Sequence, residues 1–195
     1  LATPSAFQAN PQLVMEWYQG RISKVLGVEP NPAHLALVRL EERKHLLAVI
    51  TQNVDGLHER TGITNLIEIH GNILKAHCTV CSHQQVWSSA NFDIPPRCPK
   101  GHLVRPSVVW FGETLDPNDI NQAQTYLMQC DVLFIIGTSG LVYPAAAMPQ
   151  IAKSRGALIC EFNIEKTPLS PYVDIFVQGS CEKTFPEFLE KLGLL

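Results

Sequence analysis

The sequence has little of what would place it in several common protein classes. No apolar run approaches the roughly 18 residues that a membrane-spanning helix needs. Lys and Arg number 15 against 18 Asp and Glu, so the net charge is −3 and the basic surface typical of nucleic-acid binding is not indicated. No internal repeat or low-complexity tract is present. We therefore expect neither a nucleic-acid partner nor a membrane association.

The cysteines do not follow the pattern of a disulfide framework. Cys78, Cys81 and Cys98 lie in one short segment, whereas the other three lie apart, two of them in or beside apolar segments. This distribution is typical of metal ligands plus buried thiols. Together with the lack of a secretory signal pattern, it favours a reducing compartment, and we expect the cytoplasm.

What the sequence does contain is a strong secondary-structure pattern. Asn-Pro pairs that can cap a helix begin the apolar periodicity of 10–27 and of 31–44. Further helices are predicted over 116–129, 143–156 and 184–195, strands over 45–51, 65–71, 131–137, 157–163 and 172–180, and an extended segment over 107–113. The strand–helix–strand order from 131 to 163 predicts an α/β fold with a doubly wound, mostly parallel, Rossmann-like sheet. The continuously apolar run 131–137 favours a central strand.

One segment departs from this pattern. Residues 78–104 lack hydrophobic periodicity and are rich in Cys and Pro. We expect 76–104 to form a small zinc-ribbon-like insert. The flanking stretches 1–75 and 105–195 would then form the Rossmann-like domain, with a helical part over 1–44.

The insert carries candidate metal ligands. The motifs CTVC and RCPKGH resemble the paired cysteine turns that build tetrahedral Zn²⁺ sites, and the ion would supply folding energy that so few apolar residues cannot. Three ligands are clear, namely Cys78, Cys81 and Cys98. The nearest candidate for the fourth is His102, with His83, His77 or a residue outside this chain as alternatives. We favour a structural ion over a catalytic one.

Polar side chains follow three of the predicted strands. Ligands bind beyond the carboxyl ends of strands in an open parallel sheet, and glycine followed by hydroxyls at a helix entry suits a phosphate. The clusters are Gln52, Asn53 and Asp55; Gly137, Thr138 and Ser139; and Asn163 and Glu165. Together they indicate a dinucleotide, although no G-x-G-x-x-G motif is present. The alternative is a plain turn at 137–139 and exposed loop residues after 163.

His70 ends the predicted strand 65–71, directly before a glycine. Imidazole titrates near neutral pH, so this side chain could act as a general base. A satisfied structural histidine is the alternative.

Seven motifs in register resemble those of the sirtuins, the NAD-dependent protein lysine deacylases. They are TQNVDGLHERTG, IEIHG, CTVC, LVRPSVVWFGE, VLFIIGTSGLVYPAA, CEFNIEKTP and QGSC, and they span about residues 11–190. The resemblance implies that NAD and acyl-lysine proteins or peptides are consumed, giving nicotinamide, free lysine and O-acyl-ADP-ribose. It makes the Rossmann-like domain the NAD-binding domain.

The resemblance also implies a role for particular residues. His70 would be the catalytic base, and Asn53 and Asp55 would act on the nicotinamide side with Gln52 and Val54. Phosphates and the adenine-side ribose would meet Gly137, Thr138, Ser139, Asn163, Ile164 and Glu165, with Cys181 beside adenine. The substrate peptide would add a strand to the segment that holds Val109, Phe111, Gly112 and Glu113.

Tyr18 and Arg21 stand three residues apart on one predicted helix, and the planar guanidinium suits a carboxylate. The alternative is an exposed arginine and a packed tyrosine. These residues match the desuccinylase and demalonylase branch of the sirtuins, which implies a preference for succinyl-, malonyl- or glutaryl-lysine over acetyl-lysine.

Two features depart from the family pattern. The zinc motif lacks a fourth cysteine, and the glycine-rich segment GAGxSxxSGIPxFR is not in this sequence, which opens with LATPSAF. Either residues of the whole protein are missing here, or the chain is an inactive fragment. We favour the first, because a truncated sheet would expose apolar edges. The rival hypothesis is an NAD- or ADP-ribose-binding protein without turnover, and a zinc-ribbon nucleic-acid binder is a more distant one.

Overall fold

A computed structural model describes residues 1–195, and the contacts of the chain divide it into two compact units. The first unit consists of Leu1–Glu29, Thr51–Gly56 and Glu68–Asp116. The second unit consists of Pro30–Ile50, Leu57–Ile67 and Pro117–Leu195. The predicted insert 76–104 lies within the first unit. None of the helices combines the length and the apolar character that a bilayer crossing requires.

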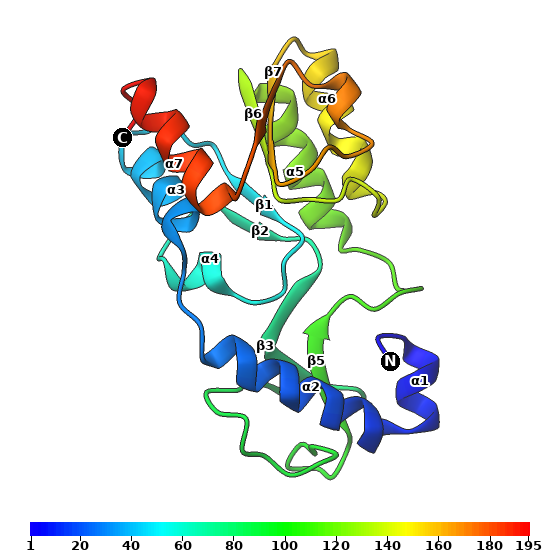
Figure 1. Cartoon of the computed structure of the whole chain (residues 1–195). Helices are drawn as coiled ribbons and strands as arrows, with labels where there is room; N and C mark the ends of the chain where they lie inside the picture. The colour runs from blue at the N-terminus through cyan, green and yellow to red at the C-terminus, as the bar shows by residue number, and fades with distance from the viewer. The chain divides into compact units, whose positions relative to one another are not determined.

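The second unit contains a three-stranded parallel sheet in the order β6-β7-β8. Its strands are β6 (Val132–Ile136), β7 (Leu158–Asn163) and β8 (Ile175–Gln178). The helices α3 (Pro32–Glu42) and α7 (Cys181–Lys191) lie on one side of this sheet, and α5 (Pro117–Gln129) and α6 (Met148–Ser154) lie on the other (Figure 1). This arrangement confirms the doubly wound α/β class.

Two details of the second unit differ from the prediction. β6 lies at the edge of the three-stranded sheet and its first residue, Val132, is 41% exposed, so β7 is the central strand instead. An apolar run predicts that the side chains of a strand are buried. It does not predict the position of the strand in the sheet, because strand order depends on contacts distant in sequence. The helix expected over 143–156 is interrupted, because Pro149 is tolerated only in a first turn: a 3₁₀ turn, η1 (Ala145–Ala147), precedes α6.

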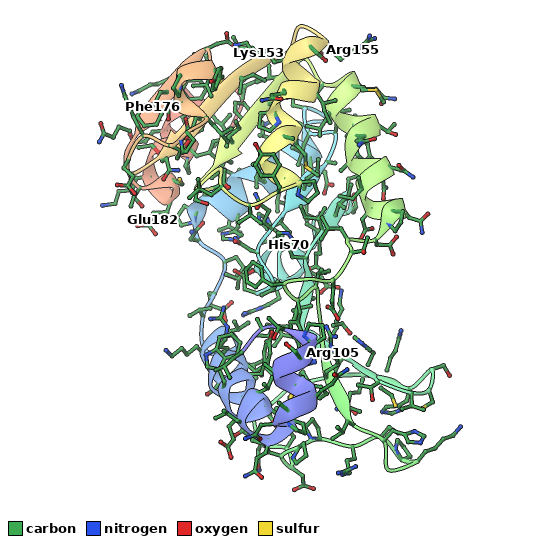
Figure 2. The ribbon with its side chains drawn as sticks, turned by 90° about the vertical axis from the view of Figure 1, so that its right-hand side faces the viewer. His70, Arg105, Lys153, Arg155, Phe176 and Glu182 are labelled. Carbon is green, nitrogen blue, oxygen red and sulfur yellow. The ribbon has the colours of Figure 1, made fainter.

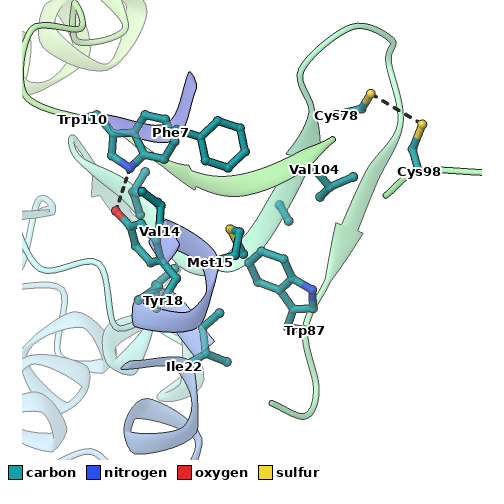
Figure 3. Close-up of a cluster of buried hydrophobic side chains, with 13 residues drawn as sticks. Phe7, Val14, Met15, Tyr18, Ile22, Cys78, Trp87, Cys98, Val104 and Trp110 are labelled. Atoms are coloured by element: carbon teal, nitrogen blue, oxygen red, sulfur yellow. Dashed lines mark hydrogen bonds between the residues drawn. The ribbon is translucent and has the colours of Figure 1, made fainter. Parts of the chain in front are cut away.

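The first unit joins two helices to an antiparallel sheet. The helices are α1 (Pro4–Ala9) and α2 (Pro11–Leu26), and the sheet has the order β4-β3-β5, with β3 (Gly71–Cys78), β4 (Gln84–Val86) and β5 (Val104–Val108). As predicted, Asn10 caps α2, because its side-chain oxygen accepts from the Leu13 N–H at 3.0 Å. The buried face of α2 packs with Trp87 and Trp110 in one apolar core (Figure 3).

Short elements complete the fold. β1 (Val49–Thr51) and β2 (Leu66–Glu68) pair in a two-stranded sheet, α4 (Leu57–Arg60) is a single turn, and η2 (Ser170–Tyr172) precedes β8. Both strands are shorter than predicted. β1 nevertheless ends directly before Gln52, so the polar segment does begin at a strand end, as the sequence indicated.

Candidate functional site

His70 is held in a defined orientation at the start of β3. Its Nδ1 lies 3.1 Å from the backbone oxygen of Gln52. A carbonyl can only accept, so this contact places the ring proton on Nδ1 and leaves Nε2 as the basic atom. Gly71 follows with φ +77°, and a Cβ there would lie 2.0 Å from the Ser107 oxygen. Only glycine therefore fits beside this histidine, which Figure 2 labels.

The segment after β1 is tied to the same strand. The Ile73 N–H donates to the Val54 oxygen at 2.7 Å. Gly56, with φ +69°, packs against the amide of Asn72, which is 1% exposed and donates to Glu68 Oε1 at 2.8 Å. The loop that carries Asn53 and Asp55 thus rests on a buried amide that the sequence analysis missed. Asn53 itself is exposed.

Tyr18 and Arg21 have different environments on α2. Tyr18 is 3% exposed, and its hydroxyl oxygen accepts a hydrogen bond of 2.7 Å from Nε1 of Trp110 (Figure 3). Burial raises the pKa of Tyr18, so the phenol keeps its proton over the neutral range. Arg21 is exposed, and its guanidinium lies 4.9 Å from the ring centroid of Trp17.

The candidate peptide-binding segment is anchored by a buried ion pair. Arg105, labelled in Figure 2, is 9% exposed and donates to both carboxylate oxygens of Glu113. The Trp110 N–H donates to the same carboxylate at 2.7 Å. The Arg105 hydrogen bond is the main reason that the pKa of Glu113 is lowered. Phe111 is 75% exposed at the tip of the segment.

Two backbone N–H groups of this segment donate hydrogen bonds to backbone oxygens elsewhere in the chain. Val109 donates to the His70 oxygen at 2.9 Å, and Phe111 donates to the Ala2 oxygen at 3.0 Å. Arg105 and Trp110 are not among the site residues predicted from the sequence, although both lie in the motif LVRPSVVWFGE. The signal in the sequence that could have identified Arg105 is its charge, because its neighbours Val104 and Pro106 are apolar.

The four predicted metal ligands come together in the first unit. The ligand atoms of Cys78, Cys81, Cys98 and His102 all lie within 4.8 Å of one another. Two sulfurs about 2.3 Å from a tetrahedral zinc ion would lie about 3.7 Å apart. The Cys78–Cys98 and Cys81–Cys98 sulfur distances are 3.6 and 3.9 Å, and Cys98 Sγ lies 3.8 Å from His102 Nδ1. Three thiols and one imidazole in this spacing fit a structural zinc ion.

The surroundings of the cluster suit thiolate ligands. Burial raises the pKa of the Cys78 thiol, but N–H groups of Val80 and Cys81 and the adjacent thiols outweigh it and lower the pKa to about 6. The alternative fourth ligands contact other groups: His77 lies 2.9 Å from the Ser107 hydroxyl, and His83 lies 3.1 Å from the Gln85 side chain.

In the second unit, the predicted nucleotide-binding residues gather at the carboxyl ends of β6 and β7. Gly137 has φ +62° and its N–H donates to the Phe162 oxygen at 2.9 Å. The Asn163 amide donates to the Thr138 oxygen at 2.8 Å. The Cys181 thiol donates to the same Phe162 oxygen at 3.1 Å, and burial raises its pKa. Polar atoms in this position suit a nucleotide.

The loop after β7 is fixed by a buried carboxylate. Glu161 is 0% exposed and accepts from the hydroxyls of Thr167 and Ser170, both at 2.6 Å. Ser139, Ile164 and Glu165 are exposed. Glu161 was not predicted, because a carboxylate inside an apolar strand reveals its partners only in the folded chain.

Comparison with known proteins identifies the family. The model of the Sir2 family matches residues 1–144. The chain is 44% identical to a protein of Pyrococcus furiosus, over 98% of this chain and 80% of that one, and 48% identical to one of Aeropyrum pernix, over 99% and 78%; both are named NAD-dependent protein deacylase. The chain therefore belongs to the Sir2 family.

Solved structures agree with this assignment. A crystal structure of a Sir2 homologue in complex with NAD superposes with a TM-score of 0.94 at 41% identity, covering 100% of this chain and 77% of that one. A complex of Sir2 with a p53 peptide and NAD⁺ has a TM-score of 0.88 at 29% identity, covering 97% and 81%.

Proposed function

We propose that this protein removes acyl groups from protein lysine side chains in a reaction that consumes NAD, with a preference for succinyl and malonyl groups. NAD-dependent deacylation follows from membership of the Sir2 family and from relatives that carry this name. The observation that carries the chemistry is the orientation of His70, whose Nε2 is left basic beside the loop of Asn53 and Asp55. Six free cysteines support work in a reducing compartment such as the cytoplasm.

Each unit contributes residues suited to part of the reaction. When bound, NAD supplies the ADP-ribosyl group that accepts the acyl group as nicotinamide leaves. In the first unit, His70 takes a proton from a ribose hydroxyl, and Asn53 and Asp55 orient the nicotinamide side. In the second unit, the turn 137–139 with Asn163 and Glu165 binds phosphates and the adenosine ribose. Lysine amide, NAD and water thus give lysine, nicotinamide and O-acyl-ADP-ribose.

The metal centre has no part in these steps. Cys78, Cys81, Cys98 and His102 would hold zinc at the far end of β3 from His70. β3 has 8 residues, which correspond to a length of about 26 Å. Zinc therefore supports the fold of the segment 78–102.

The acyl preference rests on α2. The buried Tyr18 hydroxyl can donate to a carboxylate, and the Arg21 guanidinium can bind the same group through two parallel hydrogen bonds. The methyl end of an acetyl group offers neither side chain a hydrogen-bond acceptor.

The variant Arg21→Met tests this preference, with Lys24→Met on the same helix as control. We expect kcat/KM for a succinyl-lysine peptide to fall about 10- to 100-fold in the first variant, since a charge-assisted hydrogen bond is lost. The value for an acetyl-lysine peptide should change much less, and Lys24→Met should leave both unchanged. Equal losses for the two peptides would remove the acyl assignment.

Turnover itself is tested by mass spectrometry. The protein is mixed with NAD and a succinyl-lysine peptide, and we expect nicotinamide and O-succinyl-ADP-ribose. A thermal shift with NAD and no product would instead support the binding protein without turnover.

A further inference from the structure

The hydroxyl of Tyr18 is constrained by what Trp110 can offer. An indole N–H is a donor only, and a phenol has one proton. The 2.7 Å contact between Trp110 Nε1 and the Tyr18 oxygen therefore uses the phenol as acceptor and directs its proton elsewhere. The chain supplies no acceptor for that proton in the structure. Tyr18 is thus fixed as a donor toward any group that enters beside it.

Trp110 is itself held from several sides. The guanidinium of Arg105 lies 3.4 Å from the centroid of the Trp110 ring. The ring of Phe7 is tilted against the indole, with the two ring centroids 5.3 Å apart. The backbone N–H of Trp110 is bound by Glu113, which also holds Arg105. The ring is 2% exposed. An indole packed in this way cannot rotate without breaking the ion-pair network, so the donor direction at Tyr18 is set in advance.

We propose that Trp110 is a specificity-determining positioning residue, which fixes Tyr18 as a hydrogen-bond donor and so selects acyl groups that end in an acceptor such as a carboxylate. Without the indole N–H, the hydroxyl could rotate about its C–O bond, turn its proton away and present an oxygen lone pair to the acyl group. The pocket would then lose its discrimination between charged and neutral acyl groups. This inference rests on the proposed acyl preference.

The test uses Trp110→Phe with Trp87→Phe as a matched control. Trp87 is 5% exposed in the same core, and its Nε1 has no hydrogen-bond partner. We expect Trp110→Phe to lower the succinyl-to-acetyl ratio of kcat/KM about tenfold, mainly through the KM of the succinyl peptide. Trp87→Phe should leave the ratio unchanged. If Trp110→Phe disturbs folding, Trp110 can be replaced by 3-benzothienylalanine, which keeps the bicyclic shape and lacks the N–H. We expect the same fall in the succinyl-to-acetyl ratio of kcat/KM.

A double-mutant cycle with Tyr18→Phe shows whether Trp110 acts through the hydroxyl. In the Tyr18→Phe background, Trp110→Phe should cause no further change in the ratio. A wild-type preference for succinyl that is lost in Tyr18→Phe but kept in Trp110→Phe overturns this inference alone. A wild-type protein that shows no preference for succinyl overturns the proposed acyl specificity and this inference with it.

Discussion

Arg105 brings a positive charge into the core of the first unit, and Glu113 is the group that compensates it. The pair is bidentate, and the arginine is 9% exposed. Removing one partner of such a pair leaves a buried charge uncompensated. The resulting loss of stability is larger than the stability that the intact pair adds over two apolar side chains in its place. The pair therefore fixes one conformation of the segment that carries Trp110 and Phe111.

The variant Glu113→Gln should lower the free energy of unfolding by about 2 kcal/mol at pH 7, a value reduced for the partial exposure of this side chain. Arg105 lowers the pKa of Glu113 in the folded state. A lowered pKa stabilises the fold above the unfolded-state value of about 4.3 and ceases to do so as the pH falls through the folded value. The difference between variant and wild type should therefore shrink below about pH 4. Urea unfolding at several pH values measures it, and a constant difference would contradict the prediction.

Residue types with distinctive chemistry could be selected from the sequence, and residues whose importance lies in their contacts could not. The cysteines and His102 were found because thiols at short spacing have few other uses, and the structure brings them together. Trp110 was missed because it acts on Tyr18, which is 92 positions away in sequence. Asn72 and Glu161 have side-chain hydrogen-bond partners only 4 to 9 positions away, but which polar side chains pair is decided by the folded backbone, so these two residues were missed as well. The catalytic and nucleotide roles stay predictions.

At the scale of elements, β3 connects the two chemically distinct parts of the first unit. It begins at Gly71, beside the candidate base, and ends at Cys78, a candidate metal ligand. Gly71 pairs with Val108 of β5, and a Cβ added to Gly71 would collide with the backbone oxygen of Ser107. The start of the strand therefore depends on the absence of a side chain at one position.

Gly71→Ala should destabilise the protein by about 3 kcal/mol or more, since φ +77° strains alanine and its Cβ would lie 2.0 Å from a backbone oxygen. Gly20→Ala is the matched control. Nothing lies within 4 Å of a Cβ at Gly20 on α2, so alanine there should stabilise the helix by about 0.5–1 kcal/mol. Thermal unfolding distinguishes the two. Similar melting temperatures for both variants would disprove the close approach.

The elements with strong local signals were predicted well. α2 and α3 begin within one residue of the Asn-Pro pairs that predicted them, because capping is a local interaction. β3 was missed, since its residues GNILKAHC do not alternate, and its partner β5 lies about 30 positions away. α1 was missed as well. Strand pairing is decided by contacts that a local pattern does not contain.

At the scale of the molecule, the zinc centre should act as a folding element. In the segment 78–102, Trp87 is the one large apolar side chain that is fully part of the buried core, and Phe92 and Ile94 are only partly buried, so metal binding would supply much of the folding free energy of the segment. We expect about one zinc ion per chain by atomic emission, and a fall in melting temperature when a chelator removes it. Cys98→Ser should reproduce both effects, whereas Cys130→Ser, outside the cluster, should keep the metal. A chain that binds no zinc yet melts at an unchanged temperature would exclude the metal centre.

The fold class could be predicted because the strand–helix–strand order follows from local hydrophobic patterns in the sequence. The division into two units could not, since each unit is built from three separate stretches of sequence. The short stretch Thr51–Gly56 belongs to the first unit although the residues directly before and after it belong to the second, and no change in composition marks these boundaries.

The aromatic residues are distributed unevenly between the units, and this gives each unit its own optical signal. All 3 tryptophans, Trp17, Trp87 and Trp110, belong to the first unit. The aromatic cluster of the second unit is made of the phenylalanines Phe134, Phe162, Phe185 and Phe188. Indole fluorescence therefore follows the first unit alone, whereas far-ultraviolet circular dichroism follows the helices of both. Melting curves recorded by the two methods coincide if the units unfold together and separate if they do not, without any label being attached.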